Sequence, residues 1–232
     1  METTGVVGAA VTARGLGVRG PRGPVFENVD LEMPAGGFLV VHGPGGSGRT
    51  SLLLALSGRL RLTAGAARVG EHLLPGQERR VRRLVAVARA EPATGLEGRL
   101  RVRELMAERR WIGRGVTAEA IEAACAVTGI DPPADALVEE LDPATATLLA
   151  VALTVAERPA AVVVDDIERG CTAPQREQVW QALDRVRARG ITVLAAATDL
   201  PVRPADLVPV GLPSLSGDRL PEPEEDEEEI AR

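Results

Sequence analysis

Apolar residues in this chain gather in short runs that are separated by longer amphipathic stretches. The strongest runs are typical of buried β-strands and lie at 38–41, 84–88, 161–164 and 191–199. Helical spacing of apolar residues occurs at 50–60, 99–141, 143–157 and 173–189. Buried strands that alternate with helices predict an α/β fold with a mostly parallel core sheet covered on both faces. Ligands of such folds bind at the carboxyl ends of the strands.

Other strands are predicted to form an antiparallel layer. Residues 25–33 alternate between apolar and polar, with a buried side made of Phe26, Val29, Leu31 and Met33. Residues 5–18 alternate more weakly and are predicted to be an edge strand that pairs with them. A short strand is expected at 64–70. The last strand, at 208–212, is expected at a sheet edge because Pro209 has no N–H to donate.

The amino-acid composition restricts which residues can build the core and indicates where in the cell the protein is expected. Aromatic residues are scarce among the 232 residues, so the core must be built from Ala, Val and Leu. Its large fillers are predicted to be Phe26, Phe38, Trp111 and Trp180. Cys125 and Cys171 lie far apart in the sequence, which favours reduced thiols and a cytoplasmic protein. The sequence has no signal-peptide pattern and no apolar run of the roughly 18 residues that span a bilayer.

The net charge of −6 is concentrated near the C-terminus. Residues 219–232 contain seven acidic and two basic residues, a net of −5, which leaves about −1 for the rest. We expect this segment to be a disordered acidic tail that follows a single domain at 1–218. Because the rest of the chain is nearly neutral, we expect no nucleic-acid partner.

The first apolar run leads into a glycine-rich loop and then into a helical pattern. The loop reads Gly43-x-x-x-x-Gly48-Arg49-Thr50, one residue away from the nucleotide-binding consensus GxxxxGK[ST]. Glycines let successive N–H groups surround an anion, and the following helix adds the positive end of its dipole. A polyphosphate is the expected ligand, held by Gly43, Pro44, Gly45, Gly46, Ser47, Gly48, Arg49, Thr50 and Ser51.

Three side chains of this loop have expected roles toward a nucleotide. Thr50 would offer its hydroxyl to nucleotide-bound Mg²⁺, and Ser51 would hydrogen-bond an α-phosphate. Arg49 stands where the consensus has Lys, so a planar fork replaces a compact ammonium near the β- and γ-phosphates. We expect this replacement of Lys by Arg to impair nucleotide binding less than it impairs turnover of the nucleotide.

A second stretch narrows the choice among phosphate-loop proteins. Leu141-Asp-Pro-Ala-Thr145 opens a helical pattern that ends at Glu157-Arg-Pro159, and an apolar run then ends in Asp165-Asp166. This order of parts resembles the ATP-binding cassette of ABC transporters over roughly residues 9–218, with an inserted helical subdomain at about 92–158. The resemblance implies ATP and Mg²⁺ as ligands, with Asp165 and Thr50 near the metal.

Several positions depart from the family pattern. Asp166 stands where the family has the Glu that polarises the attacking water, so it is a general-base candidate with a carboxylate one methylene shorter. Thr198 takes the position of the switch histidine. Asp142-Pro-Ala-Thr145 replaces Ser-Gly-Gly-Gln of the signature loop, although Asp142 is a good helix cap. Thr172 also departs from the family pattern. Either Ala90 or Glu91 stands where the family has its Mg²⁺-sensing glutamine. Together they predict weak hydrolysis.

The resemblance implies the ATP-binding subunit of an ABC-type transporter. Such a subunit couples the ATP-driven closure of two cassettes to a membrane permease, and it would lie in the cytoplasm on the inner face of the membrane. Its second cassette would be a copy of itself or a relative. Two alternatives stay open: a non-hydrolysing regulatory cassette that partners an active one, and a different phosphate-loop protein such as a small-molecule kinase or a GTPase.

Overall fold

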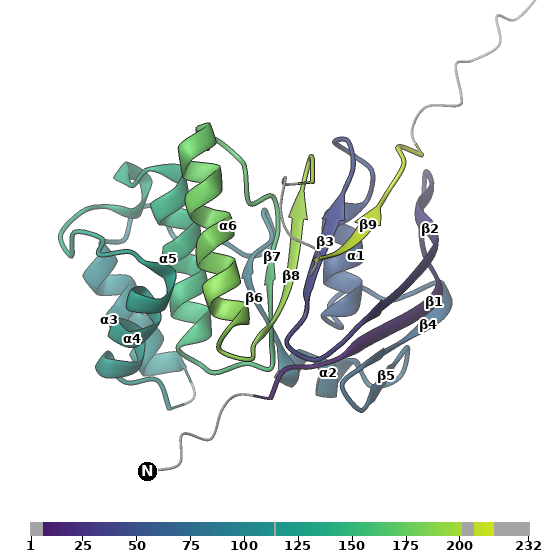
Figure 1. Ribbon diagram of the computed structural model, residues 1–232, viewed down its shortest axis with the longest axis horizontal. Coiled ribbons are helices and arrows are strands. Elements are labelled where there is room, and N and C mark those ends of the chain that lie inside the picture. Colours follow the sequence, from purple (N-terminus) through teal and green to yellow (C-terminus); the bar gives the residue numbers. More distant parts are fainter. Residues whose placement is uncertain (1–6, 114, 201–206, 216–232) are drawn as a thin grey trace, which may run out of the picture.

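The computed structural model describes residues 7–113, 115–200 and 207–215, and the predicted acidic tail lies outside the described residues. Its strands form two sheets (Figure 1). The parallel sheet has the order β6 (Val85–Arg89), β7 (Ala161–Val164), β8 (Thr192–Ala197), β3 (Phe38–His42) and β9 (Leu207–Gly211). The antiparallel sheet has the order β2 (Gly23–Met33), β1 (Val11–Gly20), β4 (Ala64–Val69) and β5 (His72–Leu74).

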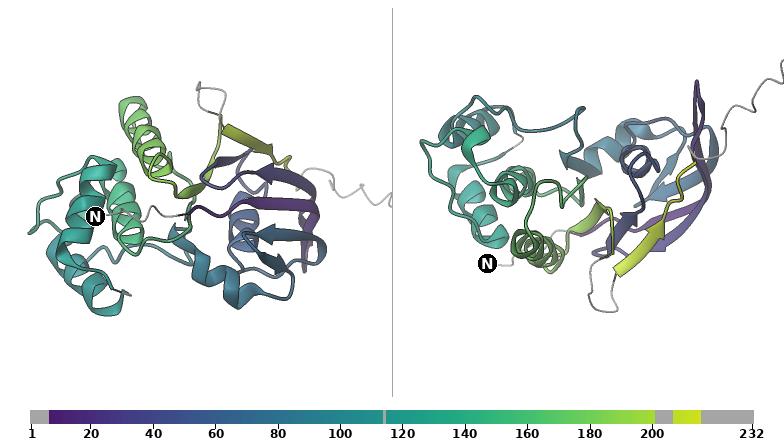
Figure 2. Two further views of the ribbon diagram at one scale, coloured as in Figure 1. Left: turned by 60° about the horizontal axis from the view of Figure 1, so that its bottom comes forward. Right: turned by 90° about the horizontal axis from the view of Figure 1, so that it is seen from above.

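Helices cover both faces of the parallel sheet (Figure 1). Between the two sheets lies α1 (Arg49–Leu56), and α2 (Glu78–Leu84) leads directly into β6. On the opposite face, α5 (Pro143–Val155) and α6 (Ala173–Arg187) pack against the sheet. Beyond them lie α3 (Val102–Ile112) and α4 (Ala118–Thr128), with a 3-10 turn at Val138–Glu140. Figure 2 shows the same division from two further directions. The predicted α/β class, with a parallel core sheet, an antiparallel layer and a helical insertion, is confirmed.

The central strands of the parallel sheet are buried because they are made mostly of Val, Ala and Leu. Every residue of β7 and β8 is buried. All described strand pairs in this sheet are parallel, so the carboxyl ends of β3, β7 and β8 meet at one end of it. The strand β9 lies at the edge beside β3, as predicted from Pro209.

The prediction that the first strand lies at an edge is wrong. In the described part of that segment, β1 pairs with β2 on one side and with β4 on the other, which makes it an interior strand. Its register shifts between Ala13 and Leu16 and again between Leu16 and Val18. Such irregularities interrupt the two-residue side-chain period. The weak alternation therefore reflects bulges rather than an exposed side.

Apolar side chains form one core on each side of the parallel sheet. Phe38 and Trp180 meet in the core under α6, with ring centroids 5.7 Å apart, and Phe26 lies in the core between the sheets. The prediction that Trp111 fills the core is wrong, because this side chain is 93% exposed. At 3.6 residues per turn, Trp111 lies about 120° around α3 from the buried Leu105.

Candidate functional site

The glycine-rich loop joins the end of β3 to the start of α1, and its glycines have two distinct geometries. Gly43 and Gly48 have φ of +150° and +91°, and a Cβ on either would overlap a carbonyl oxygen, that of Leu212 or Val25. A Cβ on Gly45 or Gly46 would meet nothing within 4 Å. The loop is therefore packed tightly at both ends and open in its middle, where a ligand can approach the backbone.

Polar groups in this loop lack partners that a phosphate would supply. Ser47 is 1% exposed, and its Oγ has no hydrogen-bond partner within the described part of the chain. A buried hydroxyl without a partner costs roughly 1–3 kcal/mol. The helix α1 also begins at Arg49 without a side-chain cap or an acidic residue in its first turn. Free N–H groups and an unpaired hydroxyl at a helix start fit an anionic ligand.

Thr50 and Asp165 form a hydroxyl–carboxylate pair beside the loop. Thr50 Oγ1 donates a hydrogen bond to Asp165 Oδ2 at 2.5 Å, and the backbone N–H of Asp165 donates to the carbonyl oxygen of Arg89 at 2.9 Å. Asp165 is 5% exposed, and burial raises its pKa although the bond from Thr50 opposes this change. Magnesium prefers oxygen ligands of this kind together with phosphate oxygens. The pair fits a nucleotide-bound Mg²⁺.

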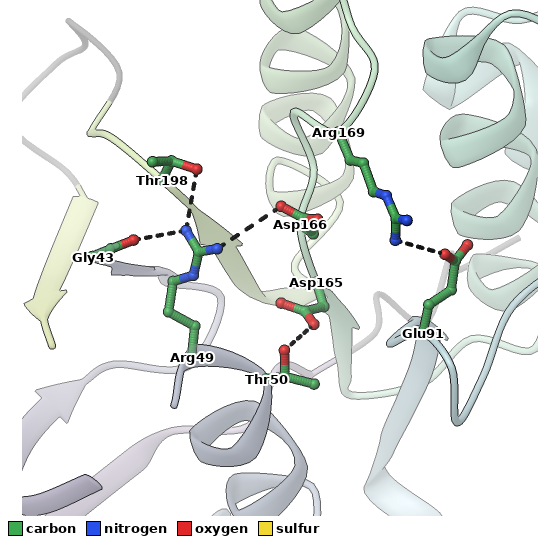
Figure 3. A network of polar contacts seen from close by, with 8 residues as sticks. All are labelled: Gly43, Arg49, Thr50, Glu91, Asp165, Asp166, Arg169 and Thr198. Carbon is green, nitrogen blue, oxygen red and sulfur yellow. Dashed lines mark hydrogen bonds and ion pairs between the residues drawn. The ribbon is translucent and has the colours of Figure 1, made fainter. Parts of the chain in front are cut away.

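Arg49 links the loop to the ends of two other strands (Figure 3). Its Nη1 donates to the carbonyl oxygen of Gly43 at 2.9 Å and to Thr198 Oγ1 at 3.3 Å. Its Nη2 lies 4.0 Å from Asp166 Oδ1, and the side chain is 14% exposed. Asp166 itself has φ of +48°, in the left-handed region that Asp tolerates better than most residues. The predicted positions 49, 166 and 198 are thus brought together.

Glu91 forms a second polar link in Figure 3, which sequence analysis did not find. Its carboxylate accepts from Arg169 Nη1 at 3.0 Å and lies 3.4 Å from Arg89 Nε. Arg169 follows the second carboxylate by three residues, and nothing in its spacing indicates this contact. Ala90 is fully buried. The two positions predicted to replace a Mg²⁺-sensing glutamine therefore carry a buried methyl group, at Ala90, and an ion-paired carboxylate, at Glu91.

Asp142 caps α5, as its position before Pro143 predicts. Its Oδ1 accepts hydrogen bonds from the N–H groups of Ala144 and Thr145, both at 3.1 Å, and from Gln175 Nε2 at 3.0 Å. Burial alone would raise the pKa of Asp142, but these hydrogen bonds outweigh it and lower the pKa. Among the described residues, no hydrogen bond or ion pair joins Asp142 to the glycine loop.

Replacing this cap should destabilise the protein without changing its nucleotide site. We expect Asp142→Ala to lower the free energy of unfolding by about 1 kcal/mol, because two N–H groups of α5 lose their acceptor. Asp142→Ser should retain most of that stability, since Ser is also a good cap. Urea unfolding of the three proteins measures the difference. Equal midpoints for the Ala variant and the wild type would contradict the capping role.

A model of the ABC transporter family matches residues 26–169, which is more than half of the chain and includes the glycine loop and both carboxylates. The chain belongs to the ABC transporter family. Among curated ABC relatives, it is 27% identical over 224 residues to the phosphonates import ATP-binding protein PhnC of Thiobacillus denitrificans. That alignment covers 86% of this chain and 83% of the relative.

Solved structures of ABC proteins share this fold. A nucleotide-free ATP-binding cassette from an ABC transporter superposes with a TM-score of 0.69 at 15% identity, over 83% of this chain and 82% of that one. A bacterial Atm1-family ABC exporter with ATP bound gives 0.69 at 14% identity, over 91% of this chain and 40% of that one. Within the described part of this ABC family member, no helix is long and apolar enough to cross a membrane.

Proposed function

We propose that this chain is the ATP-binding subunit of an ABC-type transporter and that it hydrolyses ATP only weakly. It would bind Mg²⁺ and ATP at residues 43–51, with Asp165 beside the metal. The observation that carries the proposal is the unpaired, buried hydroxyl of Ser47 in an open glycine loop, next to the Thr50–Asp165 pair. The relative PhnC is named as an ATP-binding protein for import, which agrees with this role.

The proposed binding uses the loop in three ways. The open middle of the loop, at Gly45 and Gly46, would present backbone N–H groups to the phosphates. Ser47 would donate its free hydroxyl to a phosphate oxygen. Thr50 would turn its hydroxyl from Asp165 toward the metal, which would itself supply positive charge next to the phosphates. Asp165 would contribute its carboxylate to the same metal site.

Weak hydrolysis follows from the surroundings of Asp166. A general base must come within hydrogen-bond reach of the water that it activates. The carboxylate of Asp166 is one methylene shorter than that of Glu, and it lies 4.0 Å from the guanidinium of Arg49. Arg49 is in turn tied to the carbonyl oxygen of Gly43. Attraction to this fixed cation would hold the short carboxylate away from a reacting water.

The partners and domain boundaries are also part of the proposal. Residues 1–218 would form one nucleotide-binding domain, with a helical subdomain at about 92–158 that contains α3, α4 and α5. This domain would close on a second cassette, with nucleotide between them, and would lie on the inner face of the cell membrane through a permease.

Two measurements test this function. Steady-state phosphate release should be detectable but well below the roughly 10 per second that is typical of enzymes, and Asp166→Asn should reduce it further. Affinity purification from membranes should recover a permease with the full chain. Turnover near the typical value that Asp166→Asn leaves unchanged would overturn the proposed chemistry. Bound Mg-ATP with no turnover at all would instead make the chain a non-hydrolysing regulatory cassette.

A further inference from the structure

The chain leaves the described structure beside the glycine loop. The strand β9 runs parallel to β3, and Leu212 follows it as Gly43 follows β3. The backbone N–H of Leu212 donates to the carbonyl oxygen of His42 at 2.8 Å, and the carbonyl oxygen of Leu212 packs against Gly43. The described part ends three residues later, at Leu215. The acidic segment is therefore tethered at the end of the sheet that carries the glycine loop.

Chain length alone lets the acidic segment reach the open middle of this loop. Leu215 and Gly46 are each three residues from the contact between Leu212 and Gly43, so they lie no more than roughly 26 Å apart. Residues 224–229 are all Asp or Glu and follow Leu215 by nine to fourteen residues. Such a length spans roughly 30–48 Å when extended. The tether also gives these carboxylates an effective concentration of the order of millimolar.

The open middle of the loop can accept a carboxylate as well as a phosphate. The Oγ of Ser47 is buried and has no partner in the described part of the chain, and α1 begins without a side-chain cap. Carboxylates accept hydrogen bonds from the free N–H groups at helix starts and interact favourably with the helix dipole. Asp166 does not cancel this attraction, because its own charge is paired with Arg49 at 4.0 Å.

An arginine without a partner lies next to this site. Arg22 is exposed in the turn between β1 and β2, and no hydrogen bond or ion pair joins it to any residue that the structure describes. The carbonyl oxygen of Val25, three residues further on, packs against Gly48. Arg22 is therefore within roughly 11 Å of that contact. It can pair with one carboxylate of a segment whose neighbouring carboxylate is held in the loop.

We propose that the carboxylates of residues 222–229 occupy the glycine loop of the same molecule when no nucleotide is bound, so that ATP must displace them. One carboxylate accepts from Ser47 Oγ and from N–H groups at the start of α1, and another pairs with Arg22. This inference rests on the proposed nucleotide site and adds its regulation. If the segment holds the loop for about four-fifths of the time, the apparent affinity for ATP falls about fivefold. The docking weakens as salt rises, because exposed charges are screened.

The absence of lysine allows this contact to be detected directly, since all 27 residues counted as Lys or Arg are arginines. Gly45→Lys introduces the only side-chain amine, at a position where a Cβ meets nothing within 4 Å. A water-soluble carbodiimide joins that amine to a carboxylate within contact distance as an amide, and the lost oxygen leaves on the reagent as a urea. We expect an amide between position 45 and an acidic residue of 222–229 within one molecule, identified by peptide mass. Millimolar ATP should lower its yield at least about fivefold.

A second amine locates the contact. Arg79→Lys places the amine on an exposed residue of α2, which leads into the amino end of β6 and so lies at the other end of the sheet. Its amide to residues 222–229 should form in at least about fivefold lower yield. No amide at position 45, an equal yield at position 79, or amides only between molecules would each overturn the proposal.

Removing the charge of the segment should strengthen ATP binding by the full-length chain. The variant combines Glu222→Gln, Glu224→Gln, Glu225→Gln, Asp226→Asn, Glu227→Gln, Glu228→Gln and Glu229→Gln. It should bind ATP about fivefold more tightly than the wild type at low salt, and the difference should shrink in 1 M salt. Glu71→Gln with Glu108→Gln and Glu122→Gln removes exposed negative charge elsewhere and should leave the affinity unchanged.

The binding results separate this inference from the function on which it rests. If the wild type and the neutralised chain bind ATP equally well, the docking is wrong and the nucleotide site stands. If the neutralised chain binds more tightly but no amide forms at position 45, the segment only repels ATP, and the docking is again wrong. If neither chain binds millimolar ATP, the proposed function fails and this inference fails with it.

Discussion

The double variant Arg49→Lys with Asp166→Glu should hydrolyse ATP at least about tenfold faster than the wild-type chain. A positioned general base contributes about 10²–10⁴ to rate, and one extra methylene brings the carboxylate closer to the attacking water. Lysine cannot make the planar contacts by which Arg49 now holds Gly43, Thr198 and Asp166. Releasing the carboxylate at position 166 from Arg49 and lengthening it by one methylene should therefore both raise the rate of hydrolysis.

Controls of equal size separate these effects. Arg49→Lys with Asp166→Gln has the same bulk without a base and should show no increase in phosphate release. Arg49→Lys alone should change the rate less than the double variant does. If the Glu and Gln double variants released phosphate at the same rate, Asp166 would not be the position from which water is activated.

Asp165→Asn should strengthen the nucleotide-free fold and weaken Mg²⁺-dependent binding. Asn still accepts the hydrogen bond from Thr50 but removes a buried charge, so we expect a gain of about 1 kcal/mol in the free energy of unfolding. A carboxylate that supports a bound metal is commonly worth 10- to 100-fold in affinity. We expect that loss in the affinity for ATP with Mg²⁺, and little change for ATP without it.

The stabilisation by Asp165→Asn should depend on pH. Because burial raises the pKa of Asp165 in the folded protein, the folded state holds that proton more tightly than the unfolded chain does. The wild type therefore loses stability as pH rises from about 3.9 through the folded pKa, and the full cost applies at neutral pH. Thermal unfolding should show a larger difference between the two proteins at pH 7 than at pH 4. If the two proteins differed by the same amount at pH 4 and pH 7, the buried charge of Asp165 would not be the cause of the stabilisation.

Contiguous apolar runs made the parallel sheet predictable. A strand buried on both faces needs an apolar residue at every position, as in β7 and β8, and few other structures have that pattern in four to six residues. The glycine loop was predictable because its positive φ angles at Gly43 and Gly48 leave little alternative to glycine. Asp165 followed from its place at the end of such a strand.

Features that depend on how strands pair and where side chains point in the folded protein were not predictable from the sequence. Register shifts in β1 hid an interior strand, and the narrow buried side of α3 left Trp111 in solvent. Sequence positions placed Arg49 and Asp166 near one site but could not show where the guanidinium points. The gathering of Arg59, Arg82, Arg83, Arg109 and Arg158 around one hollow was hidden for a similar reason, since a near-neutral sum of charges gives no information on how those charges are distributed in space.

The chain-wide absence of lysine changes the interpretation of Arg49. Every basic position in the sequence is arginine, so arginine at the loop position agrees with the composition as a whole. The exchange by itself is therefore weak evidence for a damaged site. Asp166 and Thr198 are not explained in this way. We therefore attribute the proposed weak hydrolysis mainly to these two residues and to the contacts that tie both to Arg49.

Equilibrium binding of ATP to the full chain, with and without Mg²⁺, measures whether residues 43–51 hold the nucleotide. Gly45 offers a matched pair of variants, because a Cβ there would meet no other atom within 4 Å. The wild type and Gly45→Asn should both bind ATP below millimolar concentration, more tightly with Mg²⁺, while Gly45→Asp should lose binding through repulsion of the phosphates. No binding by the folded wild type at millimolar ATP, or equal binding by the Asp and Asn variants, would rule out a nucleotide site at this loop.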